Sequence, residues 1–287
     1  FDGALTFNAN AFYYNYENYQ ISEIVDRTSI NLNFDAHIKG AEIEAAYEPI
    51  PGLRLNFAGG YEMTSLAKGS RAIDLIDRTA GTPGWLVVKP FATQASNCIL
   101  PEFVVTAILL NPSADLNYRN SGSSCQNAYG SGIDPVTGLP YVPYPTVQAD
   151  NAGNPIYPYD NPNYPGFDPT TVPNNGEGFE KDLSGNKLPN TPPFTLSLGA
   201  DYTTPVSSEW AATLHSDFYW QGNSFARIFN DKPYDQIHGY TNLNLALILT
   251  SQDGWQVMGY MKNVFNTTAI TGAFLNSDDT ALTTNVF

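Results

Sequence analysis

The chain has few charged residues and no long apolar segment. Only 14% of its 287 residues are Asp, Glu, Lys or Arg, whereas about a quarter is usual for soluble domains. The two most apolar windows are PEFVVTAILL from residue 101 and NLNLALILT from residue 242. Both are shorter than the roughly 20 residues that a membrane-spanning helix needs. The sequence therefore excludes a membrane protein built from helices.

Basic residues are scarce as well. Lys and Arg number 13 against 28 Asp and Glu, which gives a formal net charge of −15. Binding to nucleic acid requires an excess of Lys and Arg near the phosphates. We therefore expect no nucleic-acid partner.

Motifs for catalysis and cofactor binding are missing. His37, His215 and His238 lie on separate segments and show no HxxxH, HExxH or CxxC spacing, so no metal site is predicted. There is no Walker loop, dinucleotide fingerprint or G-x-S-x-G elbow. Five loop carboxylates match no calcium-binding repeat and predict a solvated acidic surface instead. They are Asp160, Asp168, Glu177, Glu180 and Asp182. We expect a protein that is not an enzyme and carries no cofactor.

Cysteine occurs only twice, at Cys98 and Cys125, within one polar stretch rich in Pro and Gly. A disulfide that closes this loop in an oxidising compartment is preferred to two unrelated thiols.

The sequence does contain seven segments in which apolar and polar residues alternate. They begin near Leu5, Ala41, Leu53, Phe194, Trp210, Thr241 and Trp255. A period of two is typical of β-strands. The abundance of aromatic residues, 18 Tyr and 16 Phe, also favours strands over helices. The sequence therefore predicts an all-β protein.

The connections between these strands alternate between long and short. The long ones are a loop of about ten residues after the first strand, the segment from Leu66 to Leu188, and GNSFARIFNDKPYDQIHG. The short ones are EPIPG, TTPVSSE and SQDG. Outer-membrane barrels have short periplasmic turns and long external loops, whereas a soluble sandwich has no reason to separate them. We predict an antiparallel, up-and-down transmembrane β-barrel, of which this chain holds about seven strands.

The two faces of the predicted strands differ. Aromatic residues stand at both ends of the apolar face, as expected where lipid meets water, although Trp and Tyr are also simply good strand residues. Beside the short turns are Tyr47, Tyr202, Trp210 and Trp255, and toward the long loops are Tyr13, Tyr61, Phe194, Trp220 and Phe265. The apolar face is predicted to contact outer-membrane lipid. The opposite face is predicted to point into the lumen, where it lines a pathway or packs against whatever fills the barrel. Its polar residues are Glu42, Glu44, Arg54, Asp201, His215 and Asp217.

We divide the chain into strands one to three (1–66), a long extracellular loop (67–188), and strands four to seven with a tail (189–287). The loop is rich in proline, which is incompatible with a barrel wall. Two apolar pieces in it, GWLVVKPF and PEFVVTAILL, are expected to form a short hairpin or helix. Five loop residues are candidates for contacting a ligand: Tyr157, Tyr159, Tyr164, Phe167 and Arg227. Alternatively, the four aromatic residues among them hold the loop to itself.

Four stretches together resemble the C-terminal half of the barrel of a TonB-dependent receptor. They are FYYNYENYQI (12–21), KGAEIEAAYEPIPGLRLNFAGGYEMTSL (39–66), DLSGNKLPNTPPFTLSLGADY (182–202) and YTNLNLALILTSQDGWQVMGYMKNVFN (240–266). The resemblance covers all seven strands in order and spacing. The long loop matches only around DRTAGTPGW and SNC.

This resemblance implies a barrel of 22 strands in the bacterial outer membrane, with its long loops extracellular, a plug inside it and an N-terminal box that engages TonB. It implies energy-coupled import of a bulky, scarce nutrient: a siderophore, a glycan or a cobalamin-like ligand. The expected partners are outer-membrane lipid, an extracellular small molecule or oligosaccharide, and TonB acting through the plug region. We expect the chain to lack plug, box and first strands, and to stop one strand early. The alternatives are a passive porin or structural barrel and a secreted β-sandwich adhesin that binds carbohydrate.

Overall fold

The computed structural model describes residues 3–25, 28–88, 97–110, 148–149, 155–156 and 172–273. The chain forms two compact units. Unit 1 comprises Phe1–Tyr19, Asn33–Ser70 and Leu183–Phe274, and unit 2 comprises Gln20–Leu32, Arg71–Asp182 and Leu275–Phe287. Among the described residues, no helix is both long enough and apolar enough to cross a membrane.

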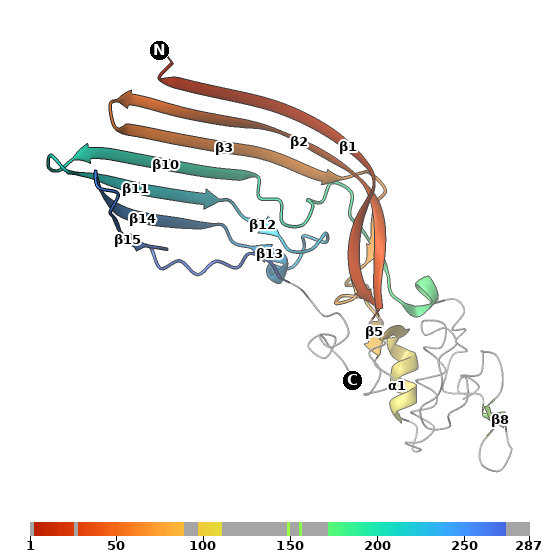
Figure 1. The fold of residues 1–287 in the computed structure, drawn as a ribbon. Coiled ribbons are helices and arrows are strands. Elements are labelled where there is room, and N and C mark those ends of the chain that lie inside the picture. Colours follow the sequence, from red (N-terminus) through yellow and green to blue (C-terminus); the bar gives the residue numbers. More distant parts are fainter. Residues whose placement is uncertain are drawn as a thin grey trace. The chain divides into compact units, whose positions relative to one another are not determined.

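The main element is one sheet of seven strands (Figure 1). Its strands are β1 (Leu5–Val25), β2 (Thr28–Ile50), β3 (Leu53–Leu66), β10 (Phe194–Pro205), β11 (Trp210–Gln221), β14 (Tyr240–Ser251) and β15 (Gln256–Met261). They lie side by side in this order, and the pairs from β2 to β15 are antiparallel. The predicted all-β, up-and-down fold of seven strands is confirmed. The sheet is open, with β1 and β15 at its edges.

Tight turns join the strands at one end. Between β2 and β3, Gly52 has a φ of +82°, and a Cβ atom there would lie 2.2 Å from the carbonyl oxygen of Thr203. Glycine is therefore required by both the backbone conformation and the close approach of β10. The N–H of Thr203 in turn donates to the carbonyl oxygen of Gly52 at 2.7 Å, which ties this turn to the neighbouring strand.

Two strand ends differ from the sequence prediction. The prediction of a loop of about ten residues after the first strand is wrong, because β1 continues to Val25 and β2 begins at Thr28. The β-branched residues of ISEIV and TSINL favour continued strand there. At the other end, β15 stops at Met261 instead of reaching Phe265. Asn263 has a φ of +51°, which turns the chain out of the strand.

The register of the sheet separates two faces. The apolar face of unit 1 carries the side chains of Ile43, Leu55, Phe57, Leu198, Leu214 and Leu247, which are 37–52% exposed. Paired positions agree across the sheet: Leu198 lies opposite Phe57 on one side and Phe218 on the other. Contiguous exposed apolar surface of this kind marks a surface that contacts a membrane or another protein.

Six buried apolar residues of unit 1 lie instead at the ends of the strands and in the loops beyond them. We call them the rim cluster: Leu66, Leu183, Leu188, Ile228, Phe229 and Ile237, each at most 6% exposed. Hydrogen bonds join their segments: the side chain of Asn186 donates to the carbonyl oxygens of Ile228 (2.9 Å) and Phe229 (2.8 Å). A small hairpin of β12 (Ser224–Phe225) and β13 (Gln236–Ile237) completes this region.

Unit 2 has its own small core. Strand β4 (Arg71–Ile73) pairs with β9 (Glu180–Asp182), β7 (Gln148–Ala149) pairs with β8 (Pro155–Ile156), and β5 (Trp85–Val88) pairs with β6 (Cys98–Pro101). The helix α1 (Glu102–Leu110) follows β6 directly. The core side chains are Val87, Val88, Cys98, Ile99, Leu100, Val104, Val105 and Val172. The first apolar piece of the long loop thus contributes β5 to a hairpin with β6, most of which precedes the second piece, and the second piece forms α1.

Candidate functional site

The polar face of unit 1 gathers the six polar residues predicted to share one side. Glu42 and Glu44 of β2 lie opposite Gly60 and Ala58 of β3. Arg54 of β3 lies opposite Asp201 of β10, and Asp201 lies opposite His215 of β11. Asp217 follows on the same side of β11, opposite Gly199. The structure therefore places all six on the face opposite the exposed leucines.

One feature of this face is a histidine held between two carboxylates. His215 Nδ1 lies 2.6 Å from Asp201 Oδ1, and His215 Nε2 lies 2.9 Å from Asp217 Oδ2. Ionised carboxylates only accept hydrogen bonds, so both contacts together require an imidazole that donates from both nitrogens. This triad fixes the ring across two strands and offsets part of the negative charge of the face.

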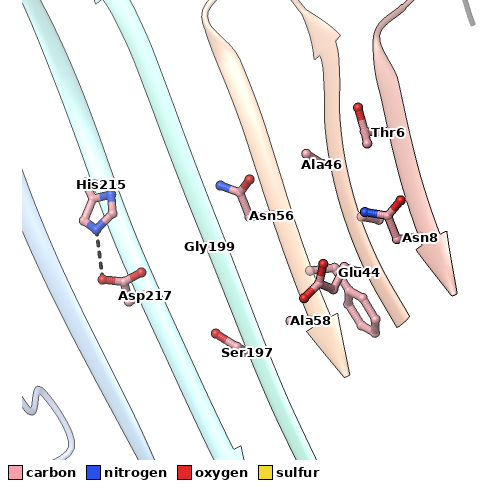
Figure 2. A pocket seen from close by; sticks show the side chains of 12 residues that line it. Thr6, Asn8, Glu44, Ala46, Asn56, Ala58, Ser197, Gly199, His215 and Asp217 are labelled. Carbon is pink, nitrogen blue, oxygen red and sulfur yellow. Dashed lines mark hydrogen bonds and ion pairs between the residues drawn. The ribbon is translucent and has the colours of Figure 1, made fainter. Parts of the chain in front are cut away.

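Two adjoining concavities follow the polar face. The larger has a volume of about 320 Å³, and Figure 2 shows the side chains that line it, among them Asn8, Glu44 and Asn56. The smaller, of about 210 Å³, is lined by Glu42, Thr195 and Tyr219 among others. Both share Glu44 and Ser197. The polar face therefore offers a continuous surface of amide, hydroxyl and carboxylate groups.

Aromatic residues on the polar face are the feature that the sequence analysis missed. Phe12, Tyr14, Tyr16 and Tyr19 follow one another along β1, and Tyr219 of β11 lies 5.8 Å from Tyr240 of β14 between ring centroids. The signal was present in FYYNYENY, where alternate residues are aromatic. Only Tyr13, on the other parity, was used as part of an aromatic belt.

Aromatic residues lie at both ends of the apolar face, as the sequence predicts. Tyr61 and Phe194 face one another with ring centroids 4.9 Å apart at the long-loop end. Tyr202 and Trp255, beside the short turns, are 43% and 72% exposed. The apolar face of unit 1 is therefore bounded by rings at both ends.

Arg227, a candidate ligand contact, is engaged within its own loop. Its guanidinium donates to both carboxylate oxygens of Asp235, Nε to Oδ1 at 2.5 Å and Nη2 to Oδ2 at 3.2 Å. It also lies 5.0 Å from the ring centroid of Phe229 and 5.4 Å from that of Tyr234. With its side chain 15% exposed, Arg227 stabilises this loop, and its contact with a ligand stays a prediction.

The other predicted loop residues lie outside the described part of the chain. They are Tyr157, Tyr159, Tyr164, Phe167 and Cys125. Cys98 is fully buried in the core of unit 2 and is disulfide-bonded. Its pairing with Cys125 stays a prediction.

No protein-family model and no curated protein matches the chain. Similar solved structures include the ferric yersiniabactin uptake receptor FyuA from Yersinia pestis, which is 11% identical with a TM-score of 0.49 over 96% of this chain and 24% of that one. The ferric preacinetobactin receptor BauA from Acinetobacter baumannii is 12% identical, with a TM-score of 0.43 over 92% of this chain and 24% of that one. The siderophore receptor PiuA from the same organism is 11% identical, with a TM-score of 0.46 over 96% of this chain and 24% of that one.

The chain thus spans about a quarter of the length of these structures. At these scores they assign neither an activity nor a ligand to this chain.

Proposed function

We propose that the chain forms part of the barrel wall of a TonB-dependent receptor in the bacterial outer membrane, which imports a bulky and scarce nutrient. One observation carries the proposal: a single antiparallel sheet exposes an apolar face bounded by aromatic rings, while its other face carries Glu44, Asp201 and His215. Lipid on the first side and a wet lumen on the second satisfy both faces. A soluble protein would leave the apolar face in water at a large cost in free energy.

The lengths of the strands support this arrangement. A tilted strand needs about 9 to 11 residues to cross the hydrocarbon layer. Strands β10, β11 and β14 each have 12 residues. On β10 the apolar positions run from Phe194, at the long-loop end, to Tyr202, beside a short turn. The band between the rings therefore matches one membrane crossing.

The receptor assignment rests on the sequence resemblance and on the two kinds of connection. The long segments between the strands lie at one end of the sheet, where an outer-membrane barrel has its extracellular loops. In this proposal these loops capture the ligand, no bond is made or broken, and TonB acts through the plug region that the resemblance implies. A passive porin shares the barrel but not the dependence on TonB.

Topology is tested with single cysteines in the full-length receptor on intact cells. Lys68→Cys follows β3 at the long-loop end, and Ser208→Cys lies in the short turn between β10 and β11; both positions are exposed. A membrane-impermeant maleimide should label Lys68→Cys alone. The unsubstituted receptor gives the background from Cys98 and Cys125.

Labelling of both positions, or of Ser208→Cys alone, would contradict the proposed orientation. Recovery of the protein in the soluble fraction would favour the secreted adhesin. Uptake that persists without TonB would favour the porin.

A further inference from the structure

An aromatic ladder runs along edge strand β1 and consists of Phe12, Tyr14, Tyr16 and Tyr19. The ring centroids are 5.4 Å apart between Phe12 and Tyr14 and 6.2 Å apart at each of the next two steps. Tyr14 and Tyr16 are 49% and 45% exposed. Rings at this spacing, comparable to the length of one hexose unit, present a row of apolar surfaces to a ligand built from repeated rings.

The ladder lies on the polar face. A Cβ atom at Gly40 would lie 2.6 Å from Cζ of Phe12, so the ring of Phe12 covers Gly40. Gly40 lies opposite Glu62 on β3 and two residues before Glu42 on β2. The ladder therefore belongs to the same surface as the carboxylates, and not to the exposed apolar face that carries Tyr13.

The charges of this surface disfavour an anionic ligand. Along the described strands of unit 1 the polar face carries the carboxylates of Glu42, Glu44, Glu62, Asp201 and Asp217. The only basic side chains among these positions are Arg54 and His215, and His215 is already bound to two of the carboxylates. A ferric chelate with negatively charged donor groups would meet like charges, which costs affinity.

The same surface suits a neutral polyhydroxylated ligand. Carboxylates and amides accept hydrogen bonds from hydroxyl groups, while aromatic rings contact the apolar faces of sugar rings. Near the smaller concavity, Tyr219 lies beside Tyr240 and donates from its hydroxyl to Oε1 of Gln221 at 3.0 Å. Hydrogen-bond acceptors and aromatic rings thus occur together on this face. Ligand sites commonly combine apolar or aromatic side chains with a small number of polar groups that fix the orientation of the ligand.

We infer that the polar face around the aromatic ladder binds a neutral oligosaccharide, and that an anionic ferric chelate is not the imported nutrient. The inference rests on the proposed receptor function and names its substrate class. Affinity comes from ring stacking and hydroxyl hydrogen bonds, so it depends little on salt.

The test uses the purified full-length receptor. A printed array of neutral oligosaccharides, covering α- and β-linked hexose and pentose chains, is compared with ferric catecholate and ferric hydroxamate chelates by direct binding. At least one neutral oligosaccharide should bind, with a dissociation constant that is nearly unchanged from low to high salt, and the catecholate chelate should not bind. Calorimetry with the oligosaccharide that binds then gives the affinities of the variants.

Tyr14→Ala and Tyr16→Ala should each weaken binding by about 10-fold, whereas Tyr14→Phe should retain it because the ring remains. Tyr13→Ala is the matched control, since Tyr13 is the adjacent, 60% exposed ring on the other face. It should leave the affinity unchanged. Heat-modifiable migration on gels verifies that each variant is a folded barrel.

Three results would each overturn the inference. They are binding to no oligosaccharide of the array, preferential binding of a ferric chelate, and equal losses of affinity from Tyr13→Ala and Tyr14→Ala. Failure of the receptor function is a separate outcome, because the protein would then be missing from the outer membrane or would import without TonB. A TonB-dependent barrel that takes a ferric chelate would overturn the ligand class alone.

Discussion

Leucines in two regions of unit 1 have opposite surroundings. In the rim cluster, Leu66, Leu183 and Leu188 are 2%, 1% and 1% exposed. On the apolar face of the sheet, Leu198, Leu214 and Leu247 are 40%, 52% and 49% exposed. Burying one leucine contributes about 1.5 to 3 kcal/mol in water, so a water-soluble fold has no reason to bury the first set and expose the second. The rim cluster is buried like the core of a protein in water, whereas the apolar face of the sheet is exposed, as the proposed contact with lipid requires.

The polar groups follow the same division. In the rim cluster they are enclosed and bonded to one another: the N–H of Leu188 donates to Oγ1 of Thr64 at 3.1 Å, and Thr64 is 5% exposed. On the sheet the carboxylates of Glu44, Asp201 and Asp217 lie on the face away from the leucines, and they are at least partly exposed. One chain therefore combines loops that are ordered by hydrophobic burial with a sheet whose two faces differ in polarity.

The largest effect is expected from breaking the buried ion pair in the loop between β11 and β14. Asp235→Ala removes the carboxylate that accepts two hydrogen bonds from Arg227, in a site where Asp235 itself is fully buried. Removing one partner of a buried pair costs about 3 to 5 kcal/mol. Hydrogen exchange read by mass spectrometry should show residues 224–237 opening.

Glu180→Ala is the matched control for this variant. It breaks the exposed pair between Arg71 and Glu180, whose side chains are 58% and 44% exposed. Exposed pairs contribute about 0 to 1 kcal/mol. If the two variants raise hydrogen exchange equally, each around its own ion pair, Arg227 and Asp235 do not stabilise the loop as a buried pair.

Leu188→Ala tests the rim cluster against the sheet directly. Truncating a fully buried leucine costs about 2 to 5 kcal/mol, because a cavity remains. Hydrogen exchange of residues 183–191 measures the loss. Leu198→Ala removes the same atoms from the apolar face, where lipid would fill the space in the proposed barrel, and should change stability far less. A similar loss from both would mean that protein covers Leu198.

Much of this division was predictable from the sequence, because a strand alternates its side chains with a period of two. That period alone places the side chains of Glu44 and Ile43 on different faces of the sheet, and likewise those of Ser197 and Leu198. All seven strands were found in this way. The errors fell at strand ends. There the end of the strand is set by the left-handed conformation of Asn263 or by a run of β-branched residues, and not by the alternation of apolar and polar residues.

The contacts across the chain were not predictable in the same way. The bonds from Asn186 to the carbonyl oxygens of Ile228 and Phe229 join segments more than 40 residues apart, and no periodicity marks them. The contact of His215 with Asp201 needs the register of two strands, which parity restricts but does not fix. The aromatic ladder was readable from FYYNYENY, but only after its face was known.

Replacing a single side chain in the middle of β10 tests which face meets lipid. Leu198→Arg places a charge on the apolar face and should destabilise the assembled barrel by about 2 to 4 kcal/mol. Ser197→Arg, one residue earlier on the polar face, should have a much smaller effect. Urea unfolding in lipid vesicles, with heat-modifiable migration on gels as the readout, compares the two variants. Equal behaviour would contradict the assignment of the faces.

The smallest effect is expected from two pairs of threonines. Thr64 and Thr191 lie 3.0 Å apart between hydroxyl oxygens in the partly buried rim, and Thr203 and Thr213 lie 2.8 Å apart on the exposed polar face. Thr64→Val leaves the N–H of Leu188 without its acceptor, at a cost of about 1 to 2 kcal/mol. Thr213→Val removes a bond that water replaces, so its cost should be about 0.5 kcal/mol or less. If urea unfolding gives the same loss for both, enclosure from water is not what distinguishes the rim from the sheet.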